Sequence, residues 1–101
     1  MSYPDGVQVT KNKMLRGVFL RTAVLFYPTP ISLKHIKTSL LTKGMTMEAD
    51  VAKVVSYLAD KGYIRFTQGC IQGFEDDDII ELTAKGVDLA EGTISDPGVD
   101  M

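Results

Sequence analysis

Apolar residues recur every three or four positions in the first part of the chain, a spacing typical of helices with one buried face. The longest such stretch predicts a helix from Thr10 to Tyr27, in which Thr10 serves as the N-cap. Pro28 and Pro30 then end this helix, because a proline disfavours helical backbone at the residue before it. The predicted buried stripe consists of Leu15, Val18, Phe19, Thr22, Leu25 and Phe26.

A second apolar face lies on the same predicted helix and is formed by Leu20, Val24 and Tyr27. A helix that is apolar on two faces either lies at the centre of its fold or shares one face with a second subunit. In a chain of only 101 residues we favour the second explanation. The pattern therefore predicts a homodimer whose interface includes these three side chains.

Two more helices are predicted, separated by a short turn that contains Gly44. The first follows the N-cap Ser32, and the second runs from the N-cap Thr46 to Gly62. The inward side chains of the first are Leu33, Ile36 and Leu40, and those of the second are Met47, Val51, Val54, Val55 and Leu58. Two helices joined by a short turn are typical of a helix-turn-helix motif.

Beyond these helices the apolar period changes to two, which indicates strands at Tyr63–Thr67 and Ile80–Thr83. The segment between them is polar and contains glycines, so the two strands predict a β-hairpin. Thr83 can then cap a short helix, Ala84–Glu91, which Gly92 ends.

Two segments resemble motifs of the winged helix-turn-helix family. Residues 54–64, VVSYLADKGYI, are similar to the exit from the recognition helix into the wing, and residues 81–90, ELTAKGVDLA, are similar to the return strand and closing helix. The resemblance implies an α+β, mostly α fold with a three-helix core, a β-hairpin wing and a short C-terminal helix. It implies a domain at residues 10–91, between a flexible N-terminal arm (1–9) and a C-terminal tail (92–101).

The tail itself carries a narrower resemblance. Its sequence from residue 92 to 99, GTISDPGV, is similar to the tail of small winged-helix proteins encoded by Mu-like transposable prophages. Together, the two resemblances imply a sequence-specific protein that binds double-stranded DNA and acts as a phage or prophage transcriptional regulator.

In a helix-turn-helix protein, the N-terminal and outward residues of the third helix reach the bases of the major groove. The resemblance therefore implies a base-reading role for residues whose small or polar side chains permit close approach: Thr46, Ala49, Asp50 and Lys53. Three acids of this helix, Glu48, Asp50 and Asp60, would repel phosphates, and only Lys53 would attract them. The alternative is a solvated helix face without a ligand.

The net charge of −2 excludes a generally polycationic protein but conceals two unlike halves. Residues 1–45 have a net charge of +6, and residues 46–101 have a net charge of −8. Phosphate contacts position a protein on DNA and dominate its affinity. The candidates for such contacts are Lys11, Lys13, Lys34, Lys37 and Lys43, for which the alternative is a solubilising role.

The predicted wing offers DNA only Arg65, Gln68 and Gln72. DNA would instead repel its acidic run, Glu75, Asp76, Asp77 and Asp78, which lacks the spacing of an EF-hand calcium loop. The run is either a solvated turn or a contact for a basic protein. The second reading supports another hypothesis, a protein–protein interaction module (an adaptor or anti-repressor) that uses its acidic helix-3 and wing face.

No pattern in the chain predicts catalysis, a metal site or a cofactor. His35 has no cysteine or carboxylate at ligand spacing, and Cys70 has no second cysteine for an internal disulfide. Residues 1–10 lack the features of a secretory signal, and the apolar stretch Gly17–Tyr27 is too short to cross a bilayer. We therefore expect a cytoplasmic protein with no membrane association.

Overall fold

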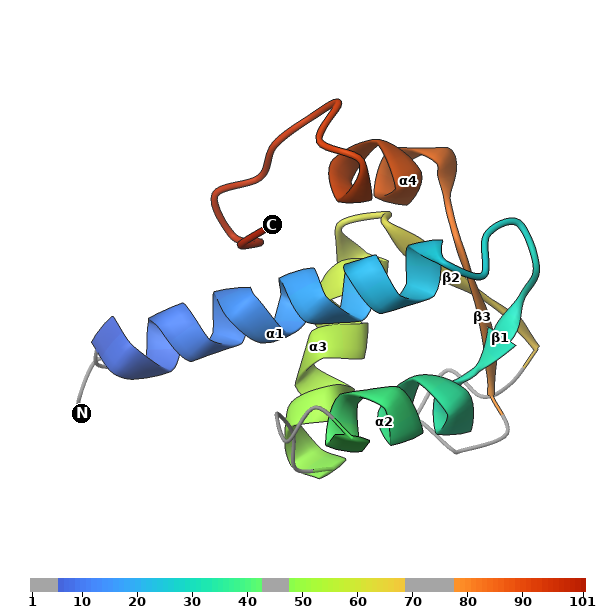
Figure 1. Ribbon diagram of the computed structural model, residues 1–101, viewed down its shortest axis with the longest axis horizontal. Coiled ribbons are helices and arrows are strands. Elements are labelled where there is room, and N and C mark those ends of the chain that lie inside the picture. The colour runs from blue at the N-terminus through green and yellow to red at the C-terminus, as the bar shows by residue number, and fades with distance from the viewer. Residues whose placement is uncertain (1–5, 43–47, 69–77) are drawn as a thin grey trace.

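The computed structural model describes residues 6–42, 48–68 and 78–101, which Figure 1 shows in colour. Within these ranges the chain forms a small α+β domain, mostly helical, with a three-stranded antiparallel sheet. The elements occur in the order α1, β1, α2, α3, β2, β3 and α4. The sequence prediction of a mostly helical α+β domain is thereby confirmed.

Helix α1 extends from Gly6 to Val24, so it begins four residues before the predicted N-cap Thr10. The end of the predicted N-terminal arm, from residue 6 to residue 9, is therefore helical. At the other end, Leu25 and Phe26 are 78% and 43% exposed, although the sequence pattern placed both in the buried stripe. That prediction is wrong because the helix ends at Val24, and helical spacing no longer applies to the turn that follows.

Helix α1 lies at the centre of the fold, where it contacts α2, α3, α4 and β3. Leu20 is 0% exposed and belongs to the core, Val24 is half-buried, and Tyr27 is 47% exposed. The prediction of a dimer interface is therefore wrong for Leu20, because other parts of the same chain cover it. Of the two explanations for a helix with two apolar faces, a central position is the one that this structure supports.

Strand β1, Ile31–Ser32, leads directly into α2, Leu33–Thr42. The predicted N-cap is confirmed, because Ser32 Oγ accepts a hydrogen bond from the backbone N–H of His35 at 3.4 Å. Helix α3 extends from Glu48 to Asp60. All the predicted inward side chains of these helices except Met47 are described, and they are buried: Leu33, Ile36, Leu40, Val51, Val54, Val55 and Leu58. Thr46, Met47 and the turn at Gly44 lie outside the described residues.

The sheet combines the predicted hairpin with one strand that the pattern did not reveal. Strands β2, Ile64–Gln68, and β3, Ile79–Leu82, pair as predicted, and β1 pairs with the other side of β3. The order is therefore β1-β3-β2, which places β3 in the middle, where Ile80 is completely buried between Ile31 and Phe66 in the register.

Helix α4, Ala84–Ala90, begins as predicted after Thr83, whose side chain accepts a hydrogen bond from Gly86 N at 3.1 Å. The last nine residues, Thr93–Met101, are called here the C-terminal segment. They fold back from α4 toward α1, as Figure 1 shows. Val99 in this segment is 5% exposed and joins the core, and Asp100 N donates to Lys13 O at 3.0 Å. The predicted tail is therefore part of the packed domain.

Candidate functional site

The outward face of α3 is the first part of the candidate site. The buried side of this helix holds Val51, Val55 and Leu58, so the opposite side is left to solvent, where Lys53 and Asp60 are exposed. Ala49 and Asp50 belong to the first turn of α3, and their side chains are not described. Thr46 lies outside the described residues. Lys53 is thus the predicted base-reading residue whose side chain the structure places on an exposed face.

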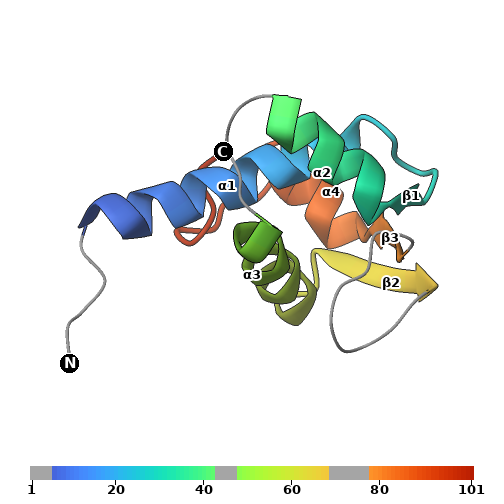
Figure 2. The ribbon, with the colours of Figure 1, turned by 90° about the horizontal axis from the view of Figure 1, so that it is seen from below.

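The predicted phosphate contacts come from α1 and α2. Lys11 and Lys34 are exposed, Lys13 and Lys37 are partly exposed, and Lys43 lies outside the described residues. Neither helix contains an acidic residue, whereas α3 contains three acids and one lysine. Lys11 and Lys13 lie in the N-terminal half of α1, and Figure 2 shows that the N-terminal end of this helix extends beyond α3. The basic and acidic halves of the sequence thus correspond to neighbouring helices, since α1 and α2 are basic and α3 is mainly acidic.

Arg16, a further cation of α1, is held by contacts within the chain. Its Nη1 donates to the carbonyl oxygen of Gly98 at 2.9 Å, and its Cζ lies 3.7 Å from the centroid of the Tyr57 ring. A guanidinium over an aromatic face gains cation–π attraction while it keeps other donors for hydrogen bonds. Arg16 therefore joins α1, α3 and the C-terminal segment.

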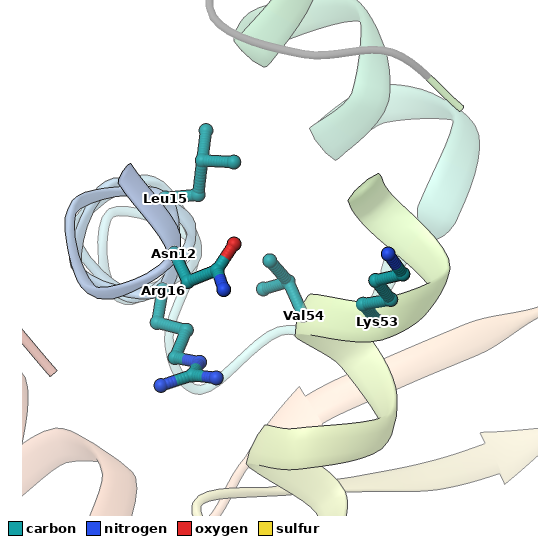
Figure 3. Close-up of a pocket in the computed structure, with 5 residues that line it drawn as sticks. All are labelled: Asn12, Leu15, Arg16, Lys53 and Val54. Carbon is teal, nitrogen blue, oxygen red and sulfur yellow. The ribbon is translucent and has the colours of Figure 1, made fainter. Parts of the chain in front are cut away.

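A small pocket of about 60 Å³ lies between α1 and α3 and is lined by Asn12, Leu15, Arg16, Lys53 and Val54. Figure 3 shows the Asn12 amide directed toward Val54, while the charged ends of Arg16 and Lys53 are directed away from one another. Pockets for small organic ligands usually measure about 300–1,000 Å³ and hold convergent polar groups. This pocket has neither property.

The residues predicted to form a wing are described only in part. Arg65 is exposed, and its Nε donates to Glu81 Oε1 at 2.5 Å across the paired strands β2 and β3. The side chain of Gln68 is not described, and Gln72, Glu75, Asp76 and Asp77 lie outside the described residues. Asp78 is only 4% exposed, and its carbonyl oxygen accepts a hydrogen bond from Leu33 N. The prediction that Asp78 belongs to an exposed acidic patch is therefore wrong, because it is buried where β3 begins beside α2.

A polar cluster that the sequence did not predict surrounds Asp96. Tyr63 Oη donates to Asp96 Oδ2 at 2.5 Å, Gly98 N donates to Oδ1 at 2.7 Å, and Lys61 Nζ lies 3.3 Å from Oδ2. Hydrogen bonding by Tyr63, aided by Gly98 and Lys61, lowers the pKa of Asp96, although burial opposes this shift. Burial and the bond to Asp96 raise the pKa of Tyr63 to about 12. The one sequence signal for this cluster was the DPGV string. Hydrophobic periodicity could not predict the structural role of that string.

The described ranges hold no group of three or more potential metal ligands. His35 is exposed, and its Nδ1 shares a hydrogen bond of 2.9 Å with Ser32 Oγ, while Cys70 lies outside the described residues. In the part of the chain covered by the structure, no helix has the length and apolar character needed to span a bilayer.

Comparisons with known proteins found no matching family model, no matching curated protein and no matching solved structure. Function is therefore inferred from the residues and contacts of this chain.

Proposed function

We propose that this chain is a winged-helix protein that binds double-stranded DNA in a sequence-specific manner, as a small phage or prophage-type transcriptional regulator. In this proposal α2 and α3 form the helix-turn-helix, and β2 and β3 form the wing. The observation that carries it is the exposed outward face of α3 beside two helices whose charged residues are all basic. The pairing of β1 with β3, as a third strand beside the hairpin, also suits a winged helix.

Each element has a distinct role in the proposed complex. Helix α3 enters the major groove, where Lys53 contacts a base edge or a nearby phosphate. Lys34 on α2 and Lys11 in the N-terminal half of α1 neutralise backbone phosphates, which supplies most of the affinity and fixes the position on the duplex. The acids of α3 limit nonspecific affinity, because they repel phosphates wherever the bases do not fit.

Fluorescence anisotropy with labelled duplexes tests this proposal directly. A duplex recovered by selection from a random library should bind more tightly than a random-sequence duplex, and both affinities should fall steeply as salt rises. If neither duplex binds at low salt, the proposal is wrong.

Lys34→Ala should weaken binding to all duplexes to a similar degree and reduce the slope of log K against log salt by about 0.9, the loss of one phosphate contact. Arg21→Ala is the matched control, because it removes one positive charge from an exposed position in the last turn of α1, outside the proposed interface. An unchanged slope for Lys34→Ala would remove Lys34 from the interface.

A second candidate function is a protein–protein interaction module that uses the acidic side of the molecule. The observation that favours it is Asp60, an exposed acid on the outward face of α3, in a half of the chain with a net charge of −8. Asp60→Lys separates the two functions. It should strengthen duplex binding if α3 faces DNA, and it should weaken binding to a lysine-rich peptide if α3 faces a basic protein.

A further inference from the structure

The C-terminal segment, Thr93–Met101, contacts α1 and also the residues that directly follow α3. On α1, Asp100 N donates to Lys13 O, and Gly98 O accepts from Arg16. Immediately beyond α3, Asp96 holds Lys61 and Tyr63. These contacts join residues that are more than thirty positions apart in the chain, and they span the junction of α1 with α3.

Gly98 lies so close to the end of the Tyr57 side chain of α3 that a Cβ would fit only if Tyr57 or the segment moved. A Cβ at this position would be 2.0 Å from Tyr57 Oη and 3.1 Å from Tyr57 Cζ. Gly98 does not have a positive φ, so glycine is needed here for space and not for an unusual backbone conformation. The Arg16 guanidinium stacks on the ring of the same Tyr57 and donates to Gly98 O. Tyr57 therefore contacts both α1 and the C-terminal segment.

The same close approach explains a glycine within α1. A Cβ on Gly17 would be 1.9 Å from Asp100 O, so the C-terminal segment lies directly on the helix backbone. Glycine weakens a helix interior relative to alanine, and here it provides the space in which the segment packs. Val99, between Gly98 and Asp100, is buried in the core.

We propose that the C-terminal segment sets the orientation of α3 against α1 and thereby controls how well the outward face of α3 fits DNA; the second part rests on the proposed function. Gly98 and Asp96 are positioning residues in this view. They touch no ligand, and they act through Tyr57, Lys61 and Tyr63.

The test is Gly98→Ala in the full chain. The added methyl group clashes with Tyr57 Oη, so we expect the backbone amide chemical shifts of residues 51–60 to change. Binding to the selected duplex should weaken about tenfold, because a displaced helix loses base contacts of roughly that value. Binding to the random-sequence duplex should change little, because flexible lysines contact its phosphates.

A double variant and a matched control make the result specific. Tyr57→Phe removes the hydroxyl that would lie 2.0 Å from a Cβ on residue 98. In the double variant, Gly98→Ala with Tyr57→Phe, the amide shifts and the affinity should therefore return part of the way to those of the unmodified chain. Ser95→Ala changes an exposed residue of the same segment and should alter neither measurement. Should Gly98→Ala fail to fold, Asp96→Asn weakens the contacts of the segment with Tyr63 and Lys61 without adding a non-hydrogen atom, and it should produce the same difference between duplexes.

The outcomes distinguish the two proposals. Unchanged α3 amide shifts in a folded Gly98→Ala variant, or equal losses for selected and random duplexes, would overturn control by the C-terminal segment. If the unmodified chain binds no duplex, the proposed function and the control of DNA affinity both fail. The claim that the C-terminal segment positions α3 is then tested by the amide shifts alone. A partial return of these shifts in the double variant, Gly98→Ala with Tyr57→Phe, supports that claim.

Discussion

The Asp96 carboxylate joins parts of the chain that are distant in sequence, because it accepts hydrogen bonds from Tyr63 Oη and from the backbone of Gly98 while it pairs with Lys61. Its pKa lies below the ordinary value of 3.8, chiefly because of the Tyr63 hydrogen bond. The pKa of Tyr63 lies above the ordinary value of 10.0, because burial and the neighbouring carboxylate disfavour a phenolate. The pair is therefore most stable as a neutral phenol and an ionised carboxylate.

These pKa shifts predict that the folded chain loses stability at both acidic and alkaline pH. The contribution of Asp96 is present above its unfolded pKa and is lost as the pH falls through the lower folded pKa. The contribution of Tyr63 is complete below pH 10.0 and is lost as the pH rises toward its folded pKa of about 12. Tyr63→Phe should cost about 1.5–3 kcal/mol of unfolding free energy at neutral pH, the value of a hydrogen bond to a charged group.

Urea unfolding at acidic, neutral and alkaline pH measures both effects. Tyr63→Phe should also reduce the dependence of stability on pH at the alkaline end. Tyr27→Phe is the control, because Tyr27 is 47% exposed. An alkaline dependence that persists unchanged in Tyr63→Phe would show that another group causes it.

Among the secondary-structure elements, α4 is capped at its N-terminus by one side chain, that of Thr83. Thr83 Oγ1 accepts from Gly86 N at 3.1 Å and donates to Gly62 O at 2.6 Å, so it also ties α4 to the turn that follows α3. The structural role of this hydroxyl is therefore larger than that of a cap alone.

Thr83→Ala should lower the unfolding free energy by about 1–2 kcal/mol, the usual cost of a lost N-cap. Urea titration gives this value directly, with an unchanged m-value if the native fold is retained. Thr93→Ala, at an exposed position of the C-terminal segment, provides the comparison. Equal stabilities for the two variants would contradict the role given to Thr83.

Regular periodicity and capping chemistry predicted much of the fold. The inward faces of α2 and α3, the caps Ser32 and Thr83, and the pairing of β2 with β3 all follow from such local patterns. Strand β1 has only two residues, too few to establish a period. The packing of residues 93–101 depends on space left by Gly17 and on the distant partners Arg16 and Tyr63, which no local pattern encodes.

The candidate site was less predictable than the fold. Helical spacing correctly placed Lys53 on an exposed face, and composition separated the basic helices from α3. The acidic character of residue 78 did not reveal its burial, because that burial arises from the chain's approach to α2. A charge in a sequence indicates the surface only where the fold leaves it exposed.

At the scale of the whole molecule, α1 is the element on which the others pack, since it contacts α2, α3, α4 and β3. Leu20 lies on this helix and is completely buried within the chain. Its truncation should therefore act on folding and not on assembly.

Leu20→Ala should reduce the unfolding free energy by about 2–5 kcal/mol, because it leaves a cavity in a packed core. Tyr27→Ala, at the exposed end of the predicted interface, should cost much less. Urea titration combined with sedimentation analysis separates stability from oligomeric state. A Leu20→Ala variant that changes oligomeric state without loss of stability would contradict the central position of α1.

The contacts of the C-terminal segment also affect the order in which the chain folds. The hydrogen bond between Lys13 and Asp100 and that between Arg16 and Gly98 each close a loop of more than eighty residues. Such long-range contacts form slowly, because the chain loses much conformational entropy before they are made. During synthesis, α1 emerges from the ribosome well before residues 98–100, so its surface at Lys13 and Gly17 stays uncovered until those residues pack against it.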